Sequence, residues 1–171
     1  MTLEEAHAAD REERVEDAAR LYEAALVADP GNADALVELV VLYWQATDYG
    51  VWKSKGINRE FVGFAGKRFR ELLGQGSDSF PGSPAIRFWA KYIAWADLGE
   101  PLDGDECRTL LRGRPEYLEP AMFLFAASQG SECESEARRL LHVCEQVGTS
   151  RCRYVVSVIE GVFKRRPRSE G

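Results

Sequence analysis

The sequence lacks the features that mark exported and membrane-spanning proteins. Its 171 residues contain no run of about 18 apolar residues, so we expect no helix that crosses a membrane. The first residues, MTLEEAHAADREER, are acidic and polar, whereas a secretory signal has a basic start and then an apolar segment. We therefore expect a cytoplasmic protein without a membrane partner.

Motifs of common catalytic and metal sites are also missing. The only histidines are His7 and His142, and there is no Gly-rich phosphate loop, Gly-x-Ser-x-Gly turn or paired metal-ligand spacing. His142, Cys144 and Glu145 are neighbours in sequence, but residues so close together on a helix rarely converge on one reacting atom. We expect no enzyme activity, no catalytic residues, no metal and no cofactor.

Cysteine is scarce, and its spacing contains no Cys-x-x-Cys pair. Disulfides belong mainly to exported proteins, and nothing in this sequence indicates export. Three of the four cysteines fall on apolar helical stripes, as small buried hydrophobes do. We therefore expect reduced thiols with a structural role at Cys107, Cys133, Cys144 and Cys152.

An excess of basic charge is absent as well. The net charge is −6, which argues against general nucleic-acid binding because phosphates attract Lys and Arg. Acidic residues dominate the chain through Glu38, whereas the segment from Lys53 to Arg70 is locally basic. We interpret this segment as a solvated face that complements the acidic N-terminal part. The alternative is a nucleic-acid or enzymatic role for it.

Helical periodicity is the dominant pattern that is present, and strand signals are weak. The pattern predicts an all-α protein of about nine helices, including one over 15–28 and one over 33–46. Pro30 ends the first of these, and Asn32 is placed to cap the second. Phe61, Phe64 and Phe69 are predicted to lie on the apolar stripe of a later helix. The remaining predicted parts are an inserted loop at 47–58, a connector at 74–83, a closing helix at 150–165 and a frayed tail at 166–171.

One stretch has a small–aromatic–small–proline order followed by an apolar helix. It comprises Ala18, Tyr22, Ala25, Pro30, Leu36, Leu39 and Tyr43. This order resembles the tetratricopeptide repeat (TPR) family, and the match is best within residues 1–46. The resemblance implies a right-handed array of antiparallel helix hairpins, which we expect to form a single domain over residues 1–171. The family's usual Gly is replaced here by Val40, and the 47–58 insertion interrupts the repeat.

The resemblance also implies a function and a binding face. In this family the first helices of the hairpins line a concave groove, which would bind an apolar or amphipathic helical segment of another protein or peptide. The chain would then be a non-enzymatic adaptor or chaperone. The alternative is that the chain itself covers the same side chains. The groove would be lined by Val37, Val41, Trp44, Ile86, Trp89 and Ile93, and the insertion would add Tyr49, Trp52, Lys53 and Lys55.

Two further questions stay open at this level. The acidic N-terminal part favours a second hypothesis, a stoichiometric inhibitor or immunity-type protein that blocks a basic enzyme surface. The apolar last helix either caps its own chain or pairs with a second copy in a homo-oligomer.

Overall fold

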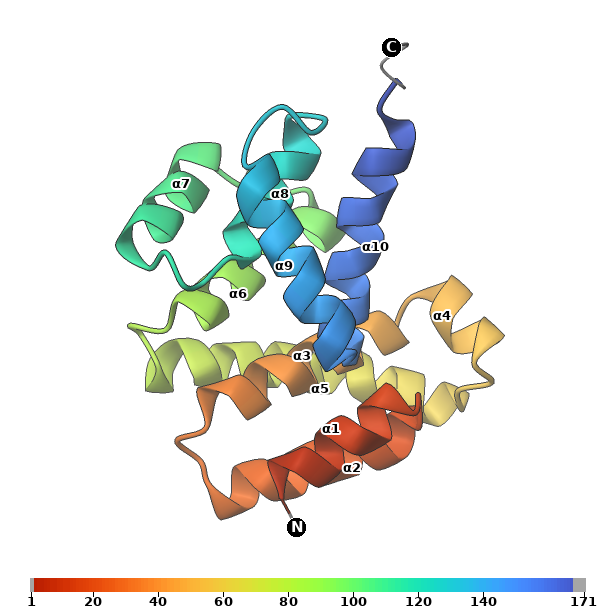
Figure 1. Ribbon diagram of the computed structural model, residues 1–171. Coiled ribbons are helices and arrows are strands. Elements are labelled where there is room, and N and C mark those ends of the chain that lie inside the picture. The colour runs from red at the N-terminus through yellow and green to blue at the C-terminus, as the bar shows by residue number, and fades with distance from the viewer. Residues whose placement is uncertain (1, 168–171) are drawn as a thin grey trace. The chain divides into compact units, whose positions relative to one another are not determined.

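Helices make up most of residues 2–167, which are the residues that the computed structural model describes (Figure 1). This range contains ten helices and no strand, which confirms the all-α prediction. The expected number was one too low, because the helix within the predicted 47–58 loop was missed. In chain order the helices are α1 (Leu3–Arg11), α2 (Val15–Ala28), α3 (Ala33–Ala46), α4 (Tyr49–Ser54), α5 (Arg59–Ser79), α6 (Pro84–Leu98), α7 (Gly104–Gly113), α8 (Glu119–Ala127), α9 (Glu134–Val147) and α10 (Ser150–Arg165).

The helices form two compact units. The first contains the chain up to Ala90 together with Gly148–Arg151, and the second contains Lys91–Val147 and the chain from Cys152 onward. The boundary falls inside α6, and α10 also contributes residues to both units. The sequence predicts one domain over residues 1–171, with 74–83 as the best candidate for a division, and that segment lies wholly within the first unit.

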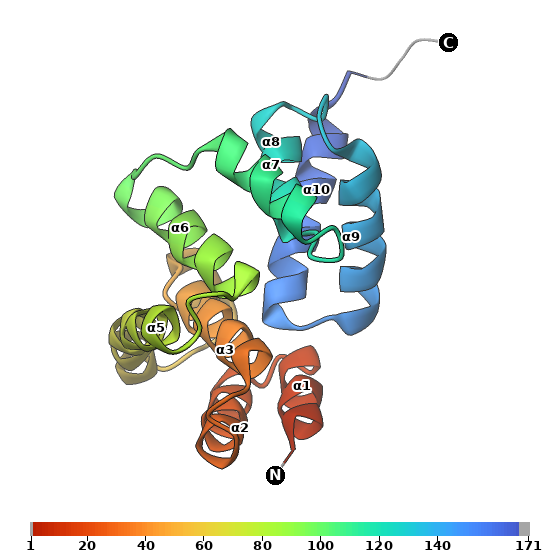
Figure 2. The same ribbon diagram turned by 90° about the vertical axis from the view of Figure 1, so that its left-hand side faces the viewer.

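In the first unit, α1 pairs with α2, and α3 packs against both α2 and α5 (Figure 2). Helices α2 and α3 have the predicted bounds, since the local signals at their junction are strong. The Asn32 side chain caps α3 by accepting a hydrogen bond from the Ala35 N–H at 3.0 Å. Helix α3 is apolar nearly all round, and its residues from Ala35 to Trp44 are all buried.

Helix α5 corrects the predicted connector at 74–83. The helix continues to Ser79 despite Gly74 and Gly76, which favour a break when judged from sequence alone. Gly76 is buried, and a Cβ atom there would lie 3.1 Å from Leu36 Cδ2 and 3.4 Å from Ile86 Cγ2. Close packing therefore requires a residue without a side chain at this point, and the tertiary contacts outweigh the weak helix propensity of glycine.

The predicted insertion loop at 47–58 also needs correction, because its central part is helix α4. Asp48 caps this helix by accepting a hydrogen bond from the Val51 N–H at 3.1 Å. After the helix, Gly56 takes a positive φ of 64°, a conformation that glycine adopts without strain. The capping signal was present in the sequence, but a helix of six residues is too short to show apolar periodicity.

In the second unit, α7 packs on α8 and α8 on α9, while α9 and α10 lie side by side in both ribbon views (Figures 1 and 2). Helix α10 has the predicted bounds of the closing helix. Arg166 was predicted to lie in the frayed tail, but its guanidinium contacts Glu134 at 2.8 Å and the Gly130 carbonyl. It also lies over the Phe163 ring, which explains why this residue is ordered. The rest of the predicted tail, from residue 168, lies outside the described residues.

All four cysteines are free thiols, as expected. Burial raises the pKa of the Cys107 thiol to about 11, and burial also raises the pKa of Cys133. Both groups are therefore protonated near neutral pH, and a protonated thiol is a poor nucleophile.

We expect only Cys133 to react with Ellman's reagent in the native protein, because it is half-buried and the other three cysteines are buried. The reaction should be slow near neutral pH, since little thiolate is present. Urea should expose all four thiols, and Cys133→Ser should abolish the native reaction. Rapid labelling of a second thiol in the native state would contradict this arrangement.

Candidate protein-binding surface

The six side chains predicted to line a groove do not form an open surface. Their exposed fractions lie between 0% and 8%, so the chain itself covers them, which was the alternative that the sequence left open. Trp44 and Trp89 instead contact each other within the first unit, with ring centroids 6.5 Å apart. The set concerned is Val37, Val41, Trp44, Ile86, Trp89 and Ile93.

The residues predicted from the insertion are the ones that reach the surface. Tyr49 is 62% exposed, and its ring meets Trp52 edge-on at 5.2 Å. Lys53 donates a hydrogen bond to the Tyr49 hydroxyl at 3.0 Å, four residues away on the same helix face. The Arg59 guanidinium lies 5.7 Å from the centre of the Trp52 ring, within the range of a cation–π contact. These four side chains form one cluster of aromatic and cationic groups at the surface, in which Trp52 is half-buried and the other three are exposed. We call them the α4 cluster.

Helix α4 is held in place by contacts on its C-terminal side. Lys55 forms an ion pair with Glu13 at 2.8 Å, and the Asn58 N–H donates to the Glu16 carboxylate at 3.4 Å. Ile57, between them, is buried. Lys55 was predicted as part of the binding site, but its charge is committed to Glu13. The α4 cluster is thus presented by an anchored helix.

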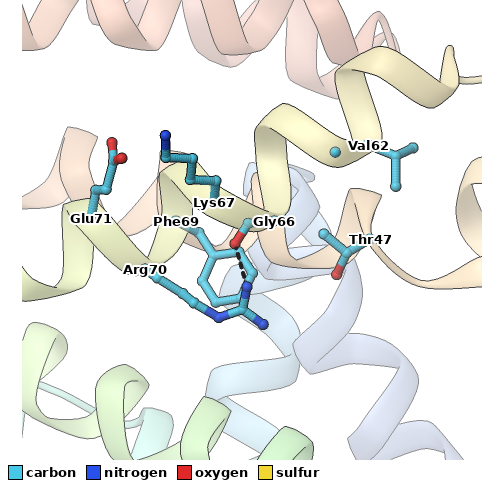
Figure 3. A pocket seen from close by; sticks show the side chains of 8 residues that line it. Thr47, Val62, Gly66, Lys67, Phe69, Arg70 and Glu71 are labelled. Atoms are coloured by element: carbon cyan, nitrogen blue, oxygen red, sulfur yellow. Dashed lines mark hydrogen bonds between the residues drawn. The ribbon is translucent and has the colours of Figure 1, made fainter.

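A hollow of about 620 Å³ lies on the neighbouring face of α5 (Figure 3). Two glycines of α5 leave it open, since a Cβ atom at Gly63 would meet nothing within 4 Å and one at Gly66 would touch only Thr47. Arg70 folds back along the helix and donates a hydrogen bond to the Gly66 carbonyl at 2.8 Å (Figure 3). The lining residues are Thr47, Val62, Gly63, Gly66, Lys67, Phe69, Arg70 and Glu71.

The hollow and the α4 cluster are formed by neighbouring parts of the chain. Thr47 lines the hollow and directly precedes Asp48, the N-cap of α4. Arg59, which contacts Trp52, lies one turn before Val62 on α5. We call the combined area the α4–α5 surface; it consists of Tyr49, Trp52, Lys53 and Arg59 together with the residues that line the hollow.

A second hollow, of about 490 Å³, lies between α2 and the other side of α5 and has an acidic rim. Phe64 lies at its edge, 52% exposed, although its position on the apolar stripe predicted a buried residue. Burial opposes ionisation of Glu23, but hydrogen bonds from Arg68 and its charge outweigh burial and hold the pKa of Glu23 below its usual range. The pairing of Arg68 with Glu23 at 2.8 Å shows that the basic segment does complement the acidic one.

Much of the acidic N-terminal part is therefore committed to contacts within the chain. Asp10 and Glu38 are buried, Glu13 and Glu23 pair with Lys55 and Arg68, and Asp17 pairs with Arg14 and Arg20. Carboxylates that already have cationic partners contribute little attraction to a basic enzyme surface. This arrangement weakens the inhibitor hypothesis, which needs a free acidic face.

The side chains considered for catalysis do not converge. His142 is exposed and its Nε2 lies 3.2 Å from Gln146 Nε2, whereas Cys144 is buried. Within residues 2–167, no group of three or more His, Cys, Asp or Glu side chains is placed to hold a metal ion. Over the same range, no helix combines the length and the apolar character that crossing a bilayer requires.

No protein-family model, curated protein or solved structure matches this chain.

Proposed function

We propose that this protein is a non-enzymatic binding module, an adaptor or chaperone, that contacts a partner protein through the α4–α5 surface. The single observation that carries the proposal is the surface cluster of the exposed Tyr49 and Arg59 with the half-buried Trp52. Tyr, Trp and Arg are the side chains that most often dominate the binding energy of protein interfaces. Their mutual contacts hold them in place before a partner arrives, which lowers the entropy lost on binding.

The hollow beside the cluster supports the same function. A partner helix or strand could approach closely at Gly63 and Gly66, because no side chain projects there. The α4–α5 surface therefore combines large anchoring side chains with a concave area that accepts a segment of a partner. This is the arrangement expected of a site for a helical or extended peptide.

The TPR-like array remains part of this proposal. Helix α1 pairs with α2, and α3 packs against both α2 and α5, as neighbouring hairpins of an array do. In such an array α4 would be an insertion between the two helices of the second hairpin. The proposed binding site would then differ from the groove that the resemblance implies, since that groove's side chains are buried.

The test is co-purification from the native host with quantitative mass spectrometry. The surface variant is Tyr49→Ala/Trp52→Ala, and the control is Val27→Ala/Leu98→Ala, which also removes two large apolar side chains that are not on this surface. Val27 and Leu98 are 81% and 70% exposed, so neither change should unfold the chain. We expect a stoichiometric partner that the wild type and the control retain and the surface variant loses. A partner that all three proteins retain equally would exclude this surface.

A further inference from the structure

The α4–α5 surface contains a row of cations whose charge nothing in the described chain neutralises. Lys53, Arg59, Lys67 and Arg70 have no carboxylate oxygen within ion-pair distance among residues 2–167. Lys53 instead bonds to a hydroxyl and Arg70 to a carbonyl. Several cations elsewhere on the chain do reach a carboxylate, namely Lys55, Arg68, Lys91, Arg108 and Arg151.

This row stands out because the chain as a whole has more acids than bases. The chain has 28 Asp and Glu residues against 22 Lys and Arg residues, so carboxylates outnumber cations. Arg11, Arg112, Arg139, Lys164 and Arg165 also reach no carboxylate among the described residues, but they are spread over α1, α7, α9 and α10, whereas the four cations of this row gather on α4 and α5. Arg59 and Arg70 lie on the same face of α5, about three turns or 16 Å apart, and the hollow at Gly63 and Gly66 lies between them.

We propose that the segment bound at the α4–α5 surface is an acidic amphipathic helix of a partner protein. Its backbone lies along α5 over Gly63 and Gly66, its carboxylates face Arg59, Lys67 and Arg70, and an apolar side chain packs on Tyr49 and Trp52. This inference rests on the proposed function and adds the chemistry of the partner. Complementary charge then accounts for the selection of partners and for fast association.

The experiment selects binders from a phage-displayed library of random peptides about 16 residues long, enough for a helix of about 24 Å. The full-length chain is used as wild type and as the variant Arg59→Glu/Lys67→Glu/Arg70→Glu. The matched control, Arg112→Glu/Arg139→Glu/Lys164→Glu, makes the same change in net charge at exposed positions of other helices. Selected peptides are then measured by fluorescence anisotropy at about 50 and 300 mM salt.

We expect wild type and control to select peptides rich in Asp and Glu, with affinity that falls about tenfold or more at high salt and in the α5 variant. Neutral apolar peptides whose binding requires Tyr49 and Trp52 would overturn the acidic partner while leaving the proposed function in place. A library that yields no binders above background would count against both.

Two further measurements exclude other occupants. Tighter binding of a single-stranded oligouridine probe than of any selected peptide, lost in the α5 variant, would identify the surface as a phosphate-binding one and overturn the proposal. A wild-type dimer in light scattering that the α5 variant abolishes would assign the surface to the acidic face of a second copy. A monomer at both salt concentrations, with acidic peptides selected, supports the proposal.

Discussion

Replacing Trp89 with alanine should lower the free energy of unfolding by about 3–5 kcal/mol. The Trp89 side chain is fully buried, and its ring centroid lies 5.4 Å from that of Phe88 and 6.5 Å from that of Trp44. Its removal gives up the burial of a large aromatic side chain and leaves a cavity that its neighbours only partly fill. Urea denaturation followed by far-UV circular dichroism measures the loss.

The matched control is Tyr49→Ala, which removes an aromatic side chain that is 62% exposed. We expect the free energy of unfolding of this variant to lie within about 1 kcal/mol of the wild-type value, since most surface substitutions have small effects. Together, Trp89→Ala and Tyr49→Ala distinguish the two interpretations of Trp89, which are burial in the interior and exposure in an open groove. If Trp89→Ala left stability unchanged and abolished partner binding, Trp89 would belong to an open groove and not to the interior.

The elements that could be predicted from the sequence are those with strong local signals. The junction of α2 and α3 is specified by Pro30 and by the cap at Asn32, so both helices have the expected bounds. Helix α4 is too short for periodicity to reveal it. The extension of α5 through Gly76 depends on contacts with Leu36 and Ile86, which are distant in sequence.

The candidate site was predicted only in part, for a related physical reason. Composition identified Tyr49, Trp52 and Lys53 as unusual for a loop; Tyr49 and Lys53 are exposed, and Trp52 is half-buried beside them. Apolar periodicity shows that a side chain avoids water, but it does not show what covers that side chain. Trp89 and Phe64 were therefore both misplaced: Trp89 was assigned to an open groove and is buried, whereas Phe64 was assigned to the core and is half exposed. The hollow at Gly63 and Gly66 had no signal, because glycine in a helix is usually a sign of weak propensity.

A buried ion pair joins α3 to the start of α10 within the first unit. Arg151 donates two hydrogen bonds to Glu38 Oε1, at 3.0 and 2.8 Å, and Glu38 is only 4% exposed. Beside it, the Ser150 N–H and hydroxyl donate to Asp10, which also accepts from Tyr22 at 3.1 Å. Burial, together with the charges of Glu38 and Asp10, raises the pKa of Tyr22 above its usual range, so its hydroxyl stays protonated and remains a donor.

Arg151→Met should therefore destabilise the protein by about 3–5 kcal/mol, because it leaves the Glu38 charge buried without its partner. The control is Arg138→Met. The Arg138 guanidinium also lies 2.8 Å from a carboxylate, but the Arg138 side chain is 59% exposed. It should cost less than about 1 kcal/mol in the same urea titration.

The double variant Glu38→Met/Arg151→Met tests the reason for the loss. It removes both charges and keeps a similar volume, so it should recover most of the lost stability, as apolar replacements of buried ion pairs often do. A double variant as unstable as Arg151→Met would show that the loss comes from other contacts of the Arg151 side chain, and not from the buried charge of Glu38. Within the first unit, the position of Ser150 and Arg151 would then depend mainly on the hydrogen bonds between Ser150 and Asp10.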